Sequence, residues 1–218
     1  MTAMRLLNER QNRDAVPTLH EILSGSERPL GRVHALYGLQ SLGSLKPRQV
    51  RQGINDKHPR VRAHAVKLSE LFLTERLDED ILSALLLLTN DPSEHVRFQL
   101  ALTLGETSDD RAIAGLARLA LDVGNGTDTR TAILSSVAGT ADKLAQRLIT
   151  SDQSDSARIL TLLSQLGQIA GSNPKTTSAV RMLSSIAGEE VSTKVQQAIL
   201  NGIGKGLAAR GSFVSKLL

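Results

Sequence analysis

The sequence predicts an all-α fold, a right-handed α-solenoid of about six stacked helix pairs followed by a C-terminal helix. Three observations predict it. Leu and Ala, which lose little on entering a helix, are abundant, whereas aromatic residues make up only 2% of the 218 residues and Trp is absent. Two stretches with a shared pattern begin 35 residues apart. Runs of alternating apolar and polar residues between turn residues, which are typical of strands, do not occur.

The repeated pattern is an Asn-Asp pair followed by Pro and Val-Arg, ahead of an apolar helix. NDKHPRVRAHAVKLSE begins at Asn55, and NDPSEHVRFQLALTLGE begins at Asn90. Apolar residues around Arg62 and Arg97 recur at the spacing of one helix face. A proline at a helix start costs little, because the missing N–H would have no intrahelical partner there. Each stretch is therefore predicted to be a loop, a cap and an amphipathic helix.

Looser copies of the pattern extend the series in both directions, and a helical pattern already begins at Thr2. First helices of successive pairs are predicted over residues 29–43, 59–70, 93–106, 126–139 and 155–171. Second helices are predicted over residues 47–54, 78–89, 109–121, 141–149 and 174–188, and a final helix follows them. One helix pair cannot bury its own apolar stripe, so a tandem array of this kind predicts a single solenoid domain over residues 1–218.

Composition excludes several classes of protein. The chain has no Cys, which excludes disulfides, thiolate metal sites and a covalently attached haem within it. The formal net charge is +4, too small and too dispersed to indicate nucleic-acid binding by itself. The longest apolar run, from Ile81 to Leu88, is far shorter than the roughly 20 residues of a membrane span. The opening MTAMRLLNER lacks the apolar region of a signal peptide.

The Asp…Val-Arg…Ala…Leu-Gly pattern resembles HEAT repeats, especially the short type found in phycobilisome-lyase-like proteins. Tetratricopeptide repeats have a similar length, but their pattern requires a Trp that this chain lacks. In HEAT repeats the Asp and Arg form a ladder between neighbouring repeats. The resemblance therefore implies a structural role for Asp56, Arg62, Asp91 and Arg97.

From Ala15 to Gly211 the chain also looks like the HEAT segment of large exported bacterial redox proteins. Those are membrane-bound-dehydrogenase-like proteins with a sugar-dehydrogenase-like β-propeller before the repeats and a cytochrome-c-like domain after them. The resemblance implies a fragment of a larger protein whose parent is exported or periplasmic. Neither a propeller sequence nor Cys-x-x-Cys-His occurs here, so the chain itself is predicted to be non-catalytic and without cofactors. Its apolar ending, FVSKLL, is covered by a neighbouring domain or folds back on the last repeat.

Residues that could carry chemistry have structural interpretations. The five histidines lack the His-Glu-x-x-His spacing of a zinc pair, so no metal is predicted and they are interpreted as surface or cap residues. Gly202, Gly204 and Gly206 match no phosphate-binding loop and are expected to permit close packing or to kink the last helix. The acidic residues at 78–80 and 109–110 each open a predicted helix, where they favour the helix dipole.

An alternative class is a HEAT-like DNA-binding protein or alkylpurine DNA glycosylase. Such proteins hold bases against aromatic side chains. This chain has one Tyr, three Phe and no Trp, and Tyr37 and Phe98 are predicted to lie in the core, which removes the stacking platform.

The second helices of HEAT arrays generally line the concave side, which is the usual binding surface. In this chain those helices or their first turns carry eight basic residues: Arg48, Arg51, Arg111, Arg118, Lys143, Arg147, Lys175 and Arg181. They predict a shallow basic groove that binds an acidic protein partner or a neighbouring domain of the parent. Long basic side chains can also merely solvate a helix and cover apolar stems, and this alternative stays open. The predicted function is a non-catalytic scaffold.

Overall fold

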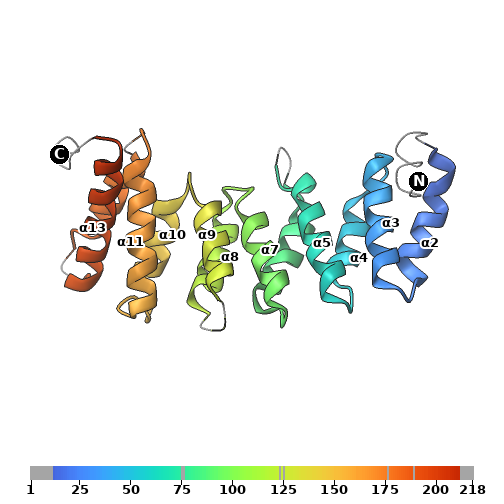
Figure 1. Ribbon diagram of the computed structural model, residues 1–218, viewed down its shortest axis with the longest axis horizontal. Helices are drawn as coiled ribbons and strands as arrows, with labels where there is room; N and C mark the ends of the chain where they lie inside the picture. Colours follow the sequence, from blue (N-terminus) through green and yellow to red (C-terminus); the bar gives the residue numbers. More distant parts are fainter. Residues whose placement is uncertain are drawn as a thin grey trace. The chain divides into compact units, whose positions relative to one another are not determined.

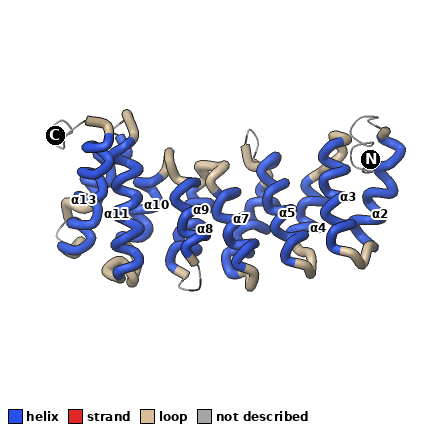
Figure 2. Tube along the Cα trace, viewed as in Figure 1, coloured by secondary structure: helices blue, strands red, loops and turns tan. Residues whose placement is uncertain are grey.

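The computed structural model describes residues 12–74, 77–122, 124, 126–175, 177–188 and 190–211. Within these ranges every regular element is a helix and no strand occurs (Figure 2), which confirms the predicted all-α class. The chain divides into two compact units, Met1–Thr107 and Ser108–Leu218. Each unit is a stack of helices in two layers, the architecture of an α-solenoid (Figure 1).

The first unit contains six α-helices and three short 3₁₀ helices in its described part. Helices α3, α5 and α7 pack side by side in one layer, with α2 against α3; α4 and α6 pack together in the other layer, with α4 also against α5. Their bounds are η1 Arg13–Ala15, α2 Val16–Gly25, α3 Pro29–Ser41, α4 Pro47–Ile54, α5 Pro59–Ser69, η2 Glu70–Phe72, α6 Glu79–Leu87, η3 Leu88–Asn90 and α7 Glu94–Leu104.

The second unit has six α-helices in its described part. Helix α10 packs against both α8 and α12 in one layer, and α11 packs against α13 in the other. Contacts of α9 with α8, and of α11 with α10 and α12, join the layers. Their bounds are α8 Asp110–Leu121, α9 Thr127–Ser136, α10 Ala141–Ile149, α11 Ala157–Ser172, α12 Thr177–Ser185 and α13 Thr193–Ala209.

Helix starts follow two local rules that the sequence displays. Pro29, Pro47 and Pro59 are the first residues of α3, α4 and α5, where their fixed φ suits the helix and no hydrogen bond is lost. Elsewhere acidic N-caps accept backbone hydrogen bonds: Asp78 Oδ1 from Ile81 N at 3.0 Å, and Asp109 Oδ1 from Arg111 N at 2.8 Å. The predicted capping role of these acidic clusters is confirmed.

The core of each unit lies between its two layers and is almost entirely aliphatic. In the first unit Leu36, Val61 and Leu100 come from one layer and Ile81 and Leu82 from the other, and all five are fully buried. Burying an aliphatic side chain of this size contributes about 1.5–3 kcal/mol, so these contacts dominate the stability of the stack.

Helices α11 and α13 approach each other more closely than side chains would allow. A Cβ atom added at Gly202 would lie 2.0 Å from the Ser164 carbonyl oxygen, and one at Gly206 would lie 2.3 Å from that of Gln168. Gly204 faces open space. The close-packing alternative predicted for these glycines is therefore confirmed at two of the three positions.

The predicted elements agree closely with the observed ones in the described residues. Helix α13 begins at Thr193, where the Ser192 hydroxyl caps it by accepting from Val195 N. The helical pattern predicted from Thr2 and the segment FVSKLL lie outside the described residues. The right-handed sense and the single-domain organisation stay predictions. In the described part no helix has the length and apolar character needed to cross a membrane.

Candidate functional site

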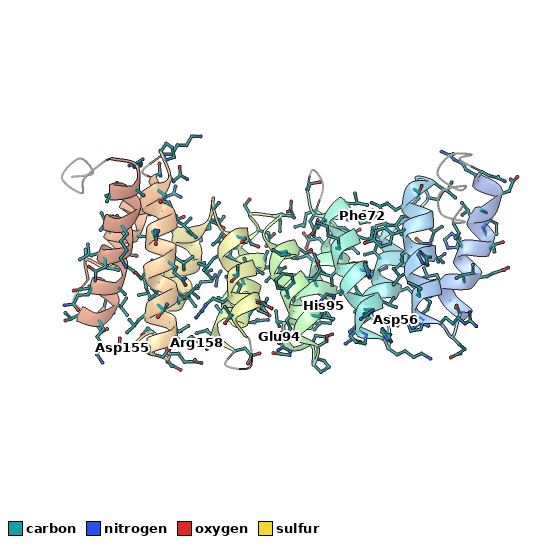
Figure 3. The ribbon with its side chains drawn as sticks, in the orientation of Figure 1. Asp56, Phe72, Glu94, His95, Asp155 and Arg158 are labelled. Atoms are coloured by element: carbon teal, nitrogen blue, oxygen red, sulfur yellow. The ribbon has the colours of Figure 1, made fainter. Side chains whose placement is uncertain are left out.

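The first unit contains a ladder of arginines and aspartates along the loop ends of α3, α5 and α7. Arg32 donates from Nε and Nη2 to the two carboxylate oxygens of Asp56, at 2.6 and 2.8 Å. Arg62 repeats this fork on Asp91, at 2.7 and 2.8 Å. Figure 3 labels Asp56 in the loop that precedes α5. Each fork joins the first helix of one repeat to the loop that starts the first helix of the next.

Arginines at the ladder positions also donate hydrogen bonds to the loops that precede their own helices. The third guanidinium nitrogen donates to the carbonyl oxygen six residues earlier, from Arg62 to Asp56 at 2.9 Å and from Arg97 to Asp91 at 2.5 Å. The carboxylates complete the network, because Asp56 Oδ1 accepts from His58 N at 2.8 Å. The structure thus brings all four predicted ladder residues, together with Arg32, into one hydrogen-bond network that links successive repeats.

Electrostatics agree with an ionised ladder. Burial raises the pKa of Asp56, but hydrogen bonds from the Arg32 guanidinium and the His58 backbone N–H outweigh it, so the net pKa lies below its usual value. The hydrogen bond to Asp56 likewise raises the pKa of Arg32, against a smaller lowering by burial. The side chains of Arg32 and Asp56 are only 6% and 10% exposed. The pair links successive repeats, and removal of one partner would leave the other charge poorly solvated.

In the second unit, predicted binding residues lie on neighbouring helices of one layer, or just before one of them. We call these six residues the second-helix surface: Arg111 and Arg118 of α8, Lys143 and Arg147 of α10, Lys175 ahead of α12, and Arg181 of α12. All six are exposed. A hollow of about 540 Å³ opens on this surface and is lined by Asp110, Asp142, Lys143, Gln146, Arg147, Thr150 and Arg181.

Carboxylates at the helix starts neutralise part of the second-helix surface. Lys143 Nζ lies 2.8 Å from Asp110 Oδ1, and Arg147 Nη2 donates to the Asp110 carbonyl oxygen at 3.3 Å. Arg181 Nη1 lies 3.3 Å from Asp142 Oδ2, and Asp142 is itself buried. The hydrogen bond from Lys143 lowers the pKa of Asp110. The surface therefore has mixed charge with a basic excess.

The remaining cations of this surface differ in how they are held. Arg111 forks onto Asp109, the cap of its own helix, and this hydrogen bond is the main reason that the pKa of Asp109 falls to about 2. The side chains of Arg118 and Lys175 are exposed and form no hydrogen bond or ion pair within the described part of the chain. These two are the cations most available to a partner.

In the first unit the structure places Arg48 and Arg51 together on α4. Arg48 is exposed, whereas Arg51 Nη1 lies 2.7 Å from Asp80 Oδ2 of α6. The sequence pattern indicated Asp80 and Asp110 only as helix-start acids, and it indicated neither these two nor Asp142 as ion-pair partners. Their spacing from the paired cations, 29, 33 and 39 residues, is close to the repeat period and could have indicated the pairs.

The aromatic residues behave differently from expectation. Tyr37 and Phe98 were predicted to be core residues, but both are only partly buried, so that prediction is wrong. Each lies at the flank of its helix's apolar stripe rather than at its centre. Tyr37 packs edge-on against the His64 ring, with its hydroxyl 3.1 Å from Nδ1.

His58 caps α5 by accepting from Arg60 N, which confirms the predicted cap role for one histidine.

Within the described ranges, no three His, Cys, Asp or Glu side chains lie close enough together to hold a metal ion.

A comparison with curated proteins returned no match, and neither did one with solved structures. Residues 47–138, from the start of α4 to just beyond α9, match a family model for HEAT repeats. Together with the two-layered helical units and the arginine–aspartate ladder, this similarity supports a HEAT-repeat fold.

Proposed function

We propose that this chain is a non-catalytic scaffold that binds a protein partner through the second-helix surface. HEAT repeats commonly serve as protein-interaction scaffolds, and their inner helices supply the binding surface. The observation that carries the proposal is the open hollow between α10 and its neighbours, rimmed by exposed cations and by ion pairs that bridge adjacent helices. Such a mixed-charge surface fits a partner with an acidic patch.

The polar groups of the described residues support a structural rather than a catalytic interpretation. The most buried charged residues, Arg32, Asp91, Arg97 and Asp142, are engaged in the ladder or in the pair with Arg181. A catalytic constellation needs a nucleophile and a base within reach of one another beside a site for substrate. Charges committed to joining repeats do not supply one.

The partner in this proposal is a neighbouring domain of a longer, exported protein with redox activity. The resemblance of the repeats to the HEAT segment of dehydrogenase and cytochrome proteins motivates it. In that setting a stack of repeats would hold an electron donor and a haem acceptor at a fixed separation.

The test is a titration of the purified chain with the domains encoded beside it, comparing wild type with the double charge reversal Arg118→Glu and Lys175→Glu. Neither side chain forms a hydrogen bond or an ion pair with the described residues. The melting temperature should therefore change little, by the equivalent of about 0.5 kcal/mol per site. Partner binding should weaken, chiefly through a slower association that depends less on salt.

The matched control reverses two exposed lysines of α13, Lys194 and Lys205, which lie outside the second-helix surface. This control should bind as wild type does. Equal binding by wild type and by the Arg118/Lys175 variant would remove the second-helix surface from consideration. Duplex DNA is the second titrant, and saturable binding of DNA but not of protein would favour the nucleic-acid alternative.

A further inference from the structure

The ladder follows a positional rule that predicts where its partners should be. Arg32, Arg62, Arg97 and Arg130 are each the fourth residue of their helices, α3, α5, α7 and α9. The carboxylate that Arg32 or Arg62 binds is the third residue before the next first helix, which is Asp56 before α5 and Asp91 before α7. In the second unit this rule pairs Arg130 of α9 with the third residue before α11. That residue is Ser154, so the position has no carboxylate.

Arg130 lacks the carboxylate that Arg32 and Arg62 bind. Its side chain forms no hydrogen bond or ion pair within the described part of the chain, although the residue is partly buried. It lines a pocket of about 190 Å³ together with Gly126, Thr127, Arg158 and Leu162, and with Leu119, Ala120 and Ile133. Arg130, whose side chain has no acceptor within the described part of the chain, therefore lies beside a cavity.

A second guanidinium adds to the positive charge of this pocket. Arg158, labelled in Figure 3 near the start of α11, donates to the carbonyl oxygens of Asp122 at 2.7 Å and Leu121 at 2.6 Å. Both acceptors are backbone carbonyl groups, which fix the position of the guanidinium. The Asp122 carboxylate accepts from Gly124 N at 2.9 Å, within its own turn. The N-terminus of α9, whose dipole favours anions, borders the same pocket at Gly126 and Thr127.

We propose that the pocket between α9 and α11 binds a small oxyanion, phosphate or carboxylate, which takes the place of the missing ladder carboxylate. The forks in the first unit show what an arginine at this position binds, namely two oxygens on one atom. Phosphate and carboxylate both present that geometry to a guanidinium. This site is separate from the second-helix surface and does not depend on the function proposed for that surface.

The experiment titrates the purified chain with inorganic phosphate and, in a separate arm, with acetate, both by calorimetry at constant ionic strength. Wild type should bind phosphate saturably at one site, and more tightly than acetate, because phosphate carries more charge. Arg130→Gln should weaken phosphate binding by about tenfold or more, since it removes a charge-assisted contact while breaking no bond of the described structure. Arg60→Gln, which removes an exposed arginine in the other unit, is the matched control and should leave the affinity unchanged.

A second variant tests the ladder argument itself. Ser154→Asp restores the carboxylate at the position the rule requires, so it should pair with Arg130, raise the melting temperature and abolish phosphate binding. Absence of saturable binding by wild type, or equal binding by wild type and Arg130→Gln, would overturn the proposal. Undiminished binding by Ser154→Asp would also overturn it, because the anion would then not occupy the place of the ladder carboxylate.

Discussion

Neighbouring helices of one layer are joined in two different ways in this chain. Between α5 and α7 the helices are separated by ordinary side chains, and the Arg62–Asp91 fork fixes their loop ends. Between α11 and α13 glycines bring the two backbones together, so that the Ser164 carbonyl oxygen would lie 2.0 Å from a Cβ at Gly202. The first junction depends on an ion pair between two side chains. The second depends on glycine residues, which have no side chain to separate the two helices.

The comparison shows that one repeat architecture tolerates very different interfaces. The ladder junction should be sensitive to charge but should accommodate changes in side-chain volume by repacking. The glycine junction has no charged group to lose, yet it cannot accept one added methyl group without moving a helix. Each of the following predictions tests one side of this contrast.

The largest effect is expected from Gly202→Ala combined with Gly206→Ala. Alanine favours a helix, but both added methyl groups would collide with carbonyl oxygens of α11, so α11 and α13 must separate. We expect a loss of about 3 kcal/mol or more in the free energy of unfolding, measured by urea denaturation. Gly204→Ala is the matched control; it faces open space and should stabilise the protein by up to about 1 kcal/mol. A double variant as stable as wild type would contradict the close contact.

A smaller loss is expected from Asp91→Asn in the ladder. The amide oxygen can still accept from Ser93 N, but Arg62 loses its counter-charge in a site where Asp91 is only 3% exposed. The loss should be about 2–3 kcal/mol, since the change leaves a sheltered guanidinium without an anion.

The control for the ladder is Asp80→Asn, which breaks the exposed pair with Arg51. Those side chains are 69% and 42% exposed, so the cost should stay below about 1 kcal/mol. Equal losses in Asp80→Asn and Asp91→Asn would show that burial does not distinguish the ladder from a surface ion pair.

The smallest effect is expected from pH. Burial and the nearby charges of His95, Arg60 and His34 lower the pKa of His64, so its protonation is harder in the folded than in the unfolded protein. The unfolded state then binds more protons, and stability should fall as the pH drops below about 6.5 towards the lowered pKa. Thermal melts of wild type and His64→Gln between about pH 7.5 and pH 5.5 test this, because the variant should show a flatter dependence.

Asp56 provides a separate acidic window for the same titration. Its pKa is lowered in the folded protein, so its contribution is present above the unfolded value of 3.8 and is lost as the pH falls through the folded pKa. The two windows therefore open at different pH, at about 6.5 for His64 and at 3.8 for Asp56. If the stability of the wild type is constant from about pH 7.5 to about pH 5 and falls only at lower pH, the predicted effect of His64 is ruled out.

The helices could be predicted from local patterns, whereas the ladder role of Asp56, Arg62, Asp91 and Arg97 was implied by the resemblance to HEAT repeats, which did not point to Arg32. A proline or acidic residue marks a helix start, and the offset between Asp91 and Arg97 repeats that between Asp56 and Arg62. The glycine junction was only half predictable. The sequence singles out Gly202 and Gly206, but their role depends on α11, where a Cβ at Gly171 would lie 2.4 Å from the Ile203 carbonyl oxygen of α13.

Charge pairing on the second helices was not predictable from residue type alone. The sequence shows cations and helix-start acids on the same helices, but which of them meet depends on how adjacent repeats rotate. Lys143 reaches back to Asp110, whereas Arg51 reaches forward to Asp80. The partial exposure of Tyr37 has a similar origin, since a residue at the edge of an apolar stripe is buried only if the neighbouring repeat covers it.

The missing carboxylate opposite Arg130 also has a meaning for how the second unit folds. A stack of repeats behaves as a one-dimensional lattice, in which each site is coupled chiefly to its nearest neighbours. The glycine contact makes the coupling between α11 and α13 strong, whereas in the described residues neither a fork nor a glycine contact couples α9 to α11. We therefore expect a boundary between folded and unfolded sites to cost less free energy between α9 and α11 than between α11 and α13, and an anion bound beside Arg130 to raise that cost.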